Sequence, residues 1–358
     1  MIIFVIGTTA EAIKVAPLIN LMSHKQISYR IISTEQHPAK VMTTLESLEC
    51  EIPYFLTINA STSGLTKMSQ VPFWFASSLF HLFRILREES PSTVIVHGDT
   101  LTTLIASLAS RLSSKTVVHL EAGYRSGVWF SPFPEEILRR LVSKLSDYHL
   151  APGSSEVSNL VAMGIDNKVI SNTRGNTGID NVLKMLPRYS KSPNETTEIL
   201  VTLHRTENLQ NRSWINQTVR ELSMLSDTCR IRFVTDNRSF KIFSETQLIE
   251  KTNVFFYEKQ SYPSFLNLIF NSDCVITDSG GLQQECAVIG VPTLVHRRIS
   301  ESKDGIGLNI MLSRNAAGAL TKFISQIDRL RHNPDLGIVS PSFLAIQALD
   351  GWGLLNDE

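Results

Sequence analysis

Three acidic side chains in the first half of the chain lie where an α/β enzyme would place catalytic carboxylates. Asp99 and Glu121 each follow a short apolar run that predicts a strand, and Glu135 opens a predicted helix. The carboxyl ends of parallel strands share one edge of a sheet, so we expect the three carboxylates to lie together there. Grouped carboxylates can serve as general acid and base. Capping of the following helix is the alternative role of Asp99.

The second half offers a histidine and a turn suited to anions. His204 and Arg205 follow directly after a predicted strand, although a lone histidine can also be purely structural. A Ser-Gly-Gly turn then opens a helix, whose unbonded N–H groups and dipole favour phosphate. Glu285, one turn inside this helix, is placed to accept hydrogen bonds from ribose hydroxyls. The predicted phosphate-binding residues are Ser279, Gly280 and Gly281.

Short β-branched runs alternate with longer helical patterns along the chain, which is typical of βαβ units that build parallel sheets. The predicted strands are Ile2–Ile6, Tyr29–Ser33, Thr93–Val96, Thr116–His119, Tyr148–Ala151, Ile199–Leu203, Ile231–Val234, Asn253–Phe256, Cys274–Thr277 and Pro292–Val295. Helices are predicted to begin near Glu11, Pro38, Leu65, Thr102 and Glu135, with others over Leu282–Ile289 and Ser342–Leu349.

This alternation of predicted strands and helices indicates an α/β protein of two doubly wound domains. The 358 residues correspond to roughly two domains of ordinary size. We place the boundary in the polar, turn-rich stretch between 170 and 192, which gives an N-terminal domain over 1–172 and a C-terminal domain over 173–335. Residues 336–358 form a terminal segment that we expect to pack on the first domain. A ligand cleft is expected between the two sheets' carboxyl edges.

Composition narrows the classes of partner. Lys and Arg total 34 and so do Asp and Glu, so the chain lacks the basic excess that nucleic-acid binding requires. The four cysteines show no metal-ligand spacing and fit buried thiols in a reducing cytoplasm. The apolar stretch Val71–Leu86 is interrupted by proline, histidine and arginine, so we expect a buried or subunit-contact helix rather than stable membrane insertion.

Eight ordered segments resemble the bacterial UDP-N-acetylglucosamine 2-epimerases of the non-hydrolysing type. The matching segments are Gly7-Thr8 with Glu11-Ala-Ile-Lys14, Thr34 with Gln36-His37, Gly98-Asp99-Thr100, Glu121-Ala-Gly-Tyr-Arg-Ser-Gly127, Ser131-Pro-Phe-Pro-Glu135-Glu136 with Arg139, Gly175-Asn-Thr-Gly-Ile-Asp180, Val201-Thr-Leu-His204-Arg205 with Glu207-Asn208, and Thr277-Asp-Ser-Gly-Gly-Leu-Gln283 with Glu285.

The resemblance implies two Rossmann-like halves in the glycosyltransferase-B arrangement and inversion at C2 of a UDP-sugar without a cofactor. UDP is eliminated to leave a glycal, which is reprotonated from the other face before UDP adds back. Asp99, Glu121 and Glu135 are then the acid–base carboxylates, and His204 holds or protonates the departing diphosphate. A hydrolysing epimerase, a glycosyltransferase and a sugar-nucleotide binder without turnover remain alternatives.

The resemblance also implies binding roles and a homodimer. The aromatic stretch Phe73–Phe83 is the candidate contact surface between subunits. Lys14 and Arg139 are cationic neighbours of the cleft, with a solvated surface charge as the alternative for each. The residues implied to bind UDP are Arg205, Ser279, Gly280 and Gly281, with Glu285 on the ribose and Gln260 and Phe265 on uracil.

Two positions depart from the family pattern. Thr9 stands where the first loop of the family has an arginine, and Ser302 stands where a second arginine is expected. Loss of one charge-assisted contact to a diphosphate typically costs about 1.5 to 3 kcal/mol. Either Arg298 and Lys303 replace the lost charge, or the substrate differs, or elimination of UDP is impaired.

Overall fold

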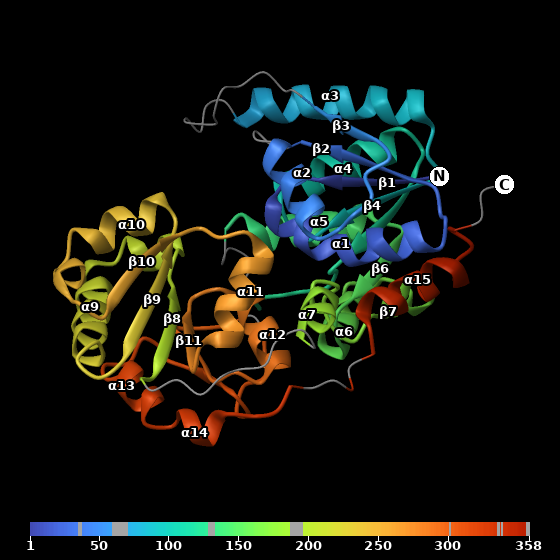
Figure 1. Cartoon of the computed structure of the whole chain (residues 1–358). Helices are drawn as coiled ribbons and strands as arrows, with labels where there is room; N and C mark the ends of the chain where they lie inside the picture. Colours follow the sequence, from blue (N-terminus) through green and yellow to red (C-terminus); the bar gives the residue numbers. More distant parts are fainter. Residues whose placement is uncertain are drawn as a thin grey trace. The chain divides into compact units, whose positions relative to one another are not determined.

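The computed structural model describes residues 1–34, 38–58, 71–127, 133–186, 196–300, 302–334, 337 and 339–355. It divides into two compact units, one of residues 1–181 with 339–358 and one of residues 182–338. Each unit is a parallel sheet covered by helices on both faces (Figure 1). Two parallel sheets with covering helices confirm the predicted α/β class.

In its described residues, the first unit contains seven parallel strands in the order β3-β2-β1-β4-β5-β6-β7. Its strands are β1 (Ile2–Ile6), β2 (Tyr29–Ser33), β3 (Phe55–Thr57), β4 (Thr93–His97), β5 (Thr116–Leu120), β6 (Tyr148–Ala151) and β7 (Ile170–Asn172). Its helices are α1 (Thr9–His24), α2 (Pro38–Ser47), α3 (Val71–Glu89), α4 (Leu101–Leu112), α5 (Glu135–Leu145), α6 (Ser154–Ala162), the 3₁₀ helix η2 (Asn167–Val169) and α15 (Pro341–Gly351), and α7 (Ile179–Met185) crosses into the second unit.

The described part of the second unit contains six parallel strands in the order β10-β9-β8-β11-β12-β13. Its strands are β8 (Glu198–Thr202), β9 (Arg230–Thr235), β10 (Val254–Glu258), β11 (Cys274–Thr277), β12 (Thr293–Val295) and β13 (Ile310–Leu312). Its helices are α8 (Thr206–Leu209), α9 (Arg212–Leu225), α10 (Asn237–Ser244), η4 (Gln247–Glu250), α11 (Tyr262–Asn271), α12 (Gly280–Ile289), α13 (Ala319–Ile324) and α14 (Ile327–Leu330).

The central strands are apolar on both faces, because helices cover both sides of each sheet. Every residue of β1 and of β4 is buried. In the first unit one core lies between the sheet and α3, α4 and α5. In the second, α9 and α10 pack on one face of the sheet, and Figure 1 shows α11 and α12 on the other.

All ten predicted strands are present, with bounds within two residues of those predicted. Three further strands, β3, β7 and β13, were not predicted; each has three residues, and they lie at sheet edges. The helix predicted near Leu65 falls in residues 59–70, which lie outside the described part of the chain, as do Gln36, His37, Ser131 and the stretch 187–195.

The first unit extends to Asn181, inside the stretch 170–192 assigned to the boundary although past residue 172, because the segment around the start of α7 is bonded to α1. The Thr177 hydroxyl donates to the Lys14 carbonyl, and the Asn181 amide donates to the Ile13 carbonyl at 2.7 Å. Helix α15 returns to the same unit, where the Ser342 N–H donates to Asp180 at 2.8 Å and the helix packs against α1.

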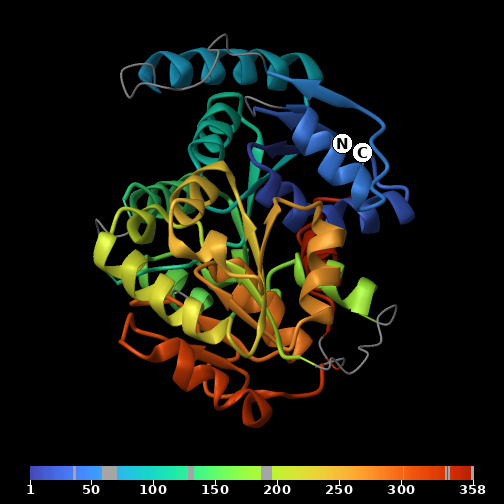
Figure 2. The same cartoon turned by 60° about the vertical axis from the view of Figure 1, so that its left-hand side comes forward.

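Helix α3 lies along the outer side of the first unit, over α4, in both ribbon views (Figures 1 and 2). Trp74 and Leu82 face the core, while Phe73 and Phe80 are 67% and 58% exposed. Of the described helices, α3 included, none is sufficiently long and apolar to span a bilayer.

Candidate active site

The order of strands places a candidate site in each unit. In an open parallel sheet, ligands bind at the carboxyl ends of the two adjacent strands where the strand order reverses. In the first sheet these strands are β1 and β4, and in the second they are β8 and β11. Asp99 lies just beyond β4, and His204 and Ser279 lie just beyond β8 and β11.

Asp99 is not the cap of the helix that follows it. Thr100 caps α4 by accepting the N–H of Thr103 at 3.2 Å. The Asp99 carboxylate instead accepts from Nε of Arg139 at 2.6 Å and remains 27% exposed. The capping alternative is therefore wrong for Asp99, and Arg139 is paired with a candidate catalytic acid.

Glu121 follows β5 and is held between two basic groups. Nζ of Lys14 lies 2.7 and 2.6 Å from its two carboxylate oxygens, and Nε2 of His97 lies 3.0 Å from Oε2. Burial alone would raise the pKa of Glu121, but the charges of Lys14 and His97 outweigh burial and lower it. Glu121 is therefore a carboxylate anchored in its ionised form.

Helix α5 brings two glutamates with different surroundings. Glu136 is fully buried and accepts from the Ser126 N–H and from Nε of Arg140, each at 3.0 Å. Oε2 of Glu135 is buried and, among the described residues, has no hydrogen-bond partner. Of the three predicted acids, Glu135 is thus the one with a buried carboxylate oxygen that lacks a partner among the described residues.

Two acid–base residues of the first unit were not singled out from the sequence. His97 ends β4 and contacts Glu121, and Glu11 is 4% exposed and accepts the Gly7 N–H at 2.6 Å. Burial raises the pKa of Glu11, and the nearby His97 opposes that effect. Glu11 lies inside the first family segment, and His97 directly precedes the Gly98-Asp99-Thr100 segment, so the signal in the sequence was their place near a strand end.

In the second unit, His204 and Arg205 lie on a segment bound to Asp278. The Asp278 carboxylate is fully buried and accepts the N–H groups of both residues, at 3.0 and 2.9 Å. The side chain of His204 is 45% exposed, so its ring is accessible. Asp278 was quoted in a motif without a role, because a sequence does not show which backbone groups a carboxylate meets.

The start of α12 has the open geometry of an anion site. Ser279 caps the helix by accepting the Leu282 N–H at 3.4 Å. A Cβ atom added at Gly280 or Gly281 would meet no atom within 4 Å, so the packing of the described chain does not require glycine at either position. Space beside the first helical N–H groups remains open, which suits close approach of a phosphate.

The predicted nucleotide contacts lie on α12 and around the start of α11. The Tyr262 hydroxyl donates to Oε1 of Glu285 at 2.9 Å. Burial, with the negative charge of Glu285, raises the pKa of Tyr262 well above its usual value, so this hydroxyl keeps its proton. Gln260 donates to the Glu258 carbonyl at 2.8 Å, and Phe265 is half-buried on α11.

The two positions that depart from the family pattern have different surroundings. Thr9 is the first residue of α1 and is half-buried. Ser302 is 7% exposed and bonds to Asp304 through its hydroxyl at 2.7 Å, whereas Arg298 and Lys303 are exposed. Ser302 therefore has a local structural role that an arginine could not fill without rearrangement.

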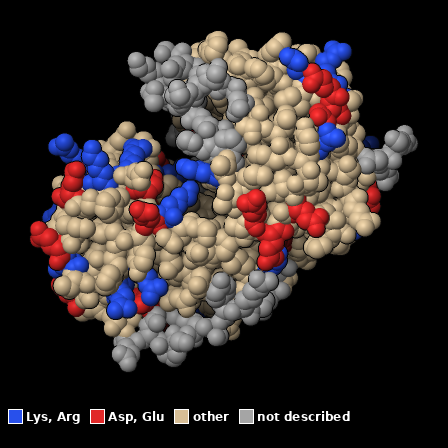
Figure 3. Space-filling view, turned by 45° about the horizontal axis from the view of Figure 1, so that its top comes forward, with Lys and Arg blue, Asp and Glu red and all other residues tan. Residues whose placement is uncertain are grey.

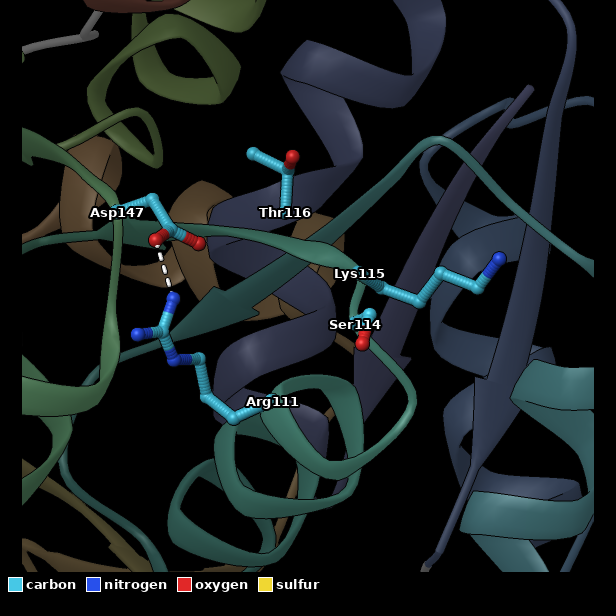
Figure 4. Close-up of a pocket in the computed structure, with 5 residues that line it drawn as sticks. All are labelled: Arg111, Ser114, Lys115, Thr116 and Asp147. Atoms are coloured by element: carbon cyan, nitrogen blue, oxygen red, sulfur yellow. Dashed lines mark hydrogen bonds and ion pairs between the residues drawn. The ribbon is translucent and has the colours of Figure 1, made fainter.

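A polar cavity of about 400 Å³ lies at the opposite edge of the first sheet (Figure 4). It is near the amino end of β5, and Arg111 in its wall is paired with Asp147 at 2.6 Å. This cavity is separate from the strand ends that carry Asp99 and Glu121. Within the described ranges, no group of three or more His, Cys, Asp or Glu side chains is arranged to hold a metal ion.

Comparison with known proteins identifies the family. The family model described as UDP-N-acetylglucosamine 2-epimerase matches residues 20–332. A UDP-N-acetylglucosamine 2-epimerase of Salmonella borreze is 34% identical over 323 residues, which cover 85% of this chain and 83% of the relative. The crystal structure of UDP-GlcNAc 2-epimerase from Neisseria meningitidis bound to UDP-GlcNAc matches with a TM-score of 0.85 and 27% identity, over 98% of this chain and 99% of that one.

A lipopolysaccharide outer core galactosyltransferase shares the fold at 16% identity and a TM-score of 0.57, over 98% of this chain and all of that one. Two Rossmann-like domains of the glycosyltransferase-B class therefore agree with both the sheets and the structural neighbours. On the match of its sequence and the likeness of its structure, the chain belongs to the UDP-N-acetylglucosamine 2-epimerase family, a family of isomerases.

Proposed function

We propose that this chain interconverts UDP-N-acetylglucosamine and UDP-N-acetylmannosamine without a cofactor. The observation that carries the proposal is the pairing of three carboxylates in the first unit: Asp99 with Arg139, Glu121 with Lys14, and Glu135 with a buried oxygen that lacks a partner among the described residues. Inversion at carbon needs one group to remove a proton and another to return one to the opposite face. Differently paired carboxylates supply such groups.

The reaction balances as an elimination and its reverse. A base removes the proton from C2, the electrons of that bond form the C1–C2 double bond, and UDP leaves with the electrons of the C1–O bond. A proton is then delivered to the other face of C2, and the UDP oxygen attacks C1. No electron is gained or lost overall, so the reaction requires no oxidant or reductant.

We assign the proton transfers at C2 to Asp99 and Glu135. Glu121 is a third member of the set, and its ion pair with Lys14 keeps a positive charge beside it. Arg139 sets the orientation of Asp99 through their hydrogen bond. His204 is assigned to the diphosphate as it leaves, because its ring is accessible and near the start of α12 in the same unit.

We assign UDP to the second unit. The N–H groups at Ser279, Gly280 and Gly281 and the side chain of Arg205 would bind the diphosphate, since helix N-termini and guanidinium groups both favour phosphate. Glu285 would accept from the ribose hydroxyls. Gln260 and Phe265 would contact uracil through its polar edge and its ring face.

Isotope exchange tests the reaction. Incubated with UDP-N-acetylglucosamine in deuterated water, the protein should introduce deuterium at C2 and produce an equilibrium mixture with UDP-N-acetylmannosamine, both measured by NMR. Asp99→Asn and Glu135→Gln should abolish exchange and still unfold cooperatively. Asp147→Asn, which alters a carboxylate at the opposite edge of the same sheet, is the matched control and should leave exchange unchanged.

The alternatives give different products. Free N-acetylmannosamine with UDP would indicate a hydrolysing epimerase, and UDP release only with an added acceptor would indicate a glycosyltransferase. UDP-sugar binding by calorimetry without exchange would indicate a binding protein. Each of these outcomes would refute the non-hydrolysing epimerase for this substrate.

We further propose a homodimer formed through the outer face of α3, in the cytoplasm. The four cysteines are buried thiols, as is usual in a reducing compartment. Charged residues of α3 begin only at Arg84, and Figure 3 shows charged side chains gathered at one end of a broad uncharged surface on this side of the first unit. Such a surface, with Phe73 and Phe80 exposed, suits a second copy.

Light scattering tests the dimer. The wild type should have twice the chain mass, and Phe80→Glu should be monomeric with unchanged secondary structure. Phe240→Glu, at an exposed phenylalanine of the second unit, is the control and should remain dimeric. A monomeric wild type would contradict the proposal.

A further inference from the structure

One buried carboxylate lies at the carboxyl ends of β8 and β11, the two adjacent strands where the strand order of the second sheet reverses. β8 and β11 are parallel neighbours in which Thr202 lies opposite Thr277. The next residue after Thr277, Asp278, has a side chain with no exposed surface. Its carboxylate accepts the backbone N–H groups of the segment that follows β8. The position of that segment therefore depends on a residue about seventy positions later in the chain.

The same carboxylate also approaches the ring of His204. Nδ1 of His204 lies 3.5 Å from Oδ1 of Asp278, while the His204 side chain as a whole is 45% exposed. An ionised carboxylate only accepts hydrogen bonds, so it favours a proton on the ring nitrogen nearest to it. The second nitrogen, Nε2, is then the one without a proton in the neutral ring.

Other charged groups of the described chain also lie near this ring. Asp236, which caps α10, is near enough that the charge of His204 acts on it. Arg205 is the neighbour of His204 in the chain, and Arg238 donates to the Thr206 hydroxyl at 2.8 Å. Among these groups, Asp278 alone combines full burial with contacts to both the backbone and the ring of His204.

We propose that Asp278 is the positioning residue for His204, holding its ring with a proton on Nδ1. In the charged ring, Nε2 then carries the second proton and can donate it to the departing diphosphate oxygen, which leaves a neutral ring with Nδ1 still protonated. When UDP adds back, the same proton returns to Nε2. The catalytic use of His204 rests on the proposed function, whereas the position of the ring proton is a property of the free protein.

NMR of the ring nitrogens tests the inference without any substrate. In protein labelled with ¹⁵N at histidine, the signals absent from His204→Asn belong to His204. At pH 8 the wild type should show a protonated Nδ1 and an unprotonated Nε2. In Asp278→Asn, where the amide can still accept from the backbone but can also donate to Nδ1, the proton should move to Nε2.

A matched variant separates the ring contact from the rest of the cluster. The Asn208 amide donates to Asp278 at 3.1 Å, so Asn208→Ala removes one partner of that carboxylate without changing His204. In Asn208→Ala, the ring of His204 should keep its proton on Nδ1, as in the wild type. The wild-type measurement requires no variant at Asp278, so the test does not depend on Asp278→Asn folding. A wild-type ring protonated mainly at Nε2, or one unaffected by Asp278→Asn, would overturn the proposal.

Kinetics then connect the position of the proton to catalysis. Exchange at C2 should fall by roughly 10²- to 10⁴-fold in Asp278→Asn, as for other histidines given the wrong tautomer. In the His204→Asn background the same change should cause little further loss, because the two residues act as a unit. An equal loss in both backgrounds would refute positioning through His204. If the ring proton moves in Asp278→Asn but the wild type shows no exchange at C2, the positioning role of Asp278 would be supported and only the proposed epimerase activity would be refuted.

Discussion

The three candidate acids of the first unit are of one chemical type but have three different surroundings. Glu121 is paired with Lys14 and His97, Asp99 with Arg139, and Glu135 retains an unpartnered buried oxygen within the described chain. Contacts from residues distant in sequence set these differences. The ion pair with Lys14 and the contact with His97 lower the pKa of Glu121, so this carboxylate is poorly suited to carry a proton.

Tyr262 also acts as a single residue, because its hydroxyl orients the carboxylate of Glu285, which is assigned to the ribose. Tyr262→Phe removes a hydrogen bond to a charged group, and such bonds contribute about 1.5 to 3 kcal/mol. We expect the affinity for UDP to fall roughly tenfold or more in calorimetry. Tyr257→Phe, on an exposed position of β10, is the control and should bind UDP as the wild type does. If Tyr262→Phe bound UDP as tightly as the wild type does, the assignment of Glu285 to the ribose would be contradicted.

At the scale of elements, the starts of helices carry much of the predicted binding. α12 begins with an open Gly-Gly turn, while α1 begins at Thr9, where the family pattern has an arginine. A cation at a helix N-terminus opposes the helix dipole by about 0.3 to 1 kcal/mol. An arginine is favourable there only if an anion offsets that cost.

At the start of α1, an arginine in place of Thr9 should improve the binding of UDP. Thr9→Arg should tighten UDP binding by about one to two decades, because a charge-assisted contact to a diphosphate contributes about 1.5 to 3 kcal/mol. Thermal stability without ligand should decrease slightly. Ala10→Arg, at the exposed next position of the same helix, is the control and should not improve binding. Equal UDP affinity in Thr9→Arg and the wild type would mean that this loop does not meet the diphosphate.

At the scale of the whole molecule, buried neutral histidines occur in both units. Burial lowers the pKa of His119 to about 3 and the pKa values of His149 and His296 to about 4. Each is 1% exposed, and His296 lies between the hydroxyls of Thr218 and Ser313, each at 2.9 Å. On unfolding these rings regain an ordinary pKa near 6.5 and bind protons.

The unfolded chain therefore binds more protons than the folded one below pH 6.5, so acid destabilises the fold. Stability should be fully present above about pH 6.5 and fall by roughly 2 kcal/mol per histidine between pH 7 and pH 5. Urea unfolding at both values measures the loss. His296→Gln should reduce the pH dependence of the second unit, whereas His81→Gln, at an exposed position, should not. Stability that is equal at both pH values would contradict the assignment of neutral buried rings.

The sequence by itself determined the parallel α/β architecture, most of the strands and the motifs of the family, because buried strands and Gly-rich helix starts have local signatures. It did not reveal β3, β7 and β13, since three-residue edge strands are paired on one side and carry little apolar pattern. Tertiary structure alone decided that Asp99 meets Arg139 rather than capping α4, and that Asp278 supports His204. Contacts across many positions follow from sheet order and register, which local patterns do not encode.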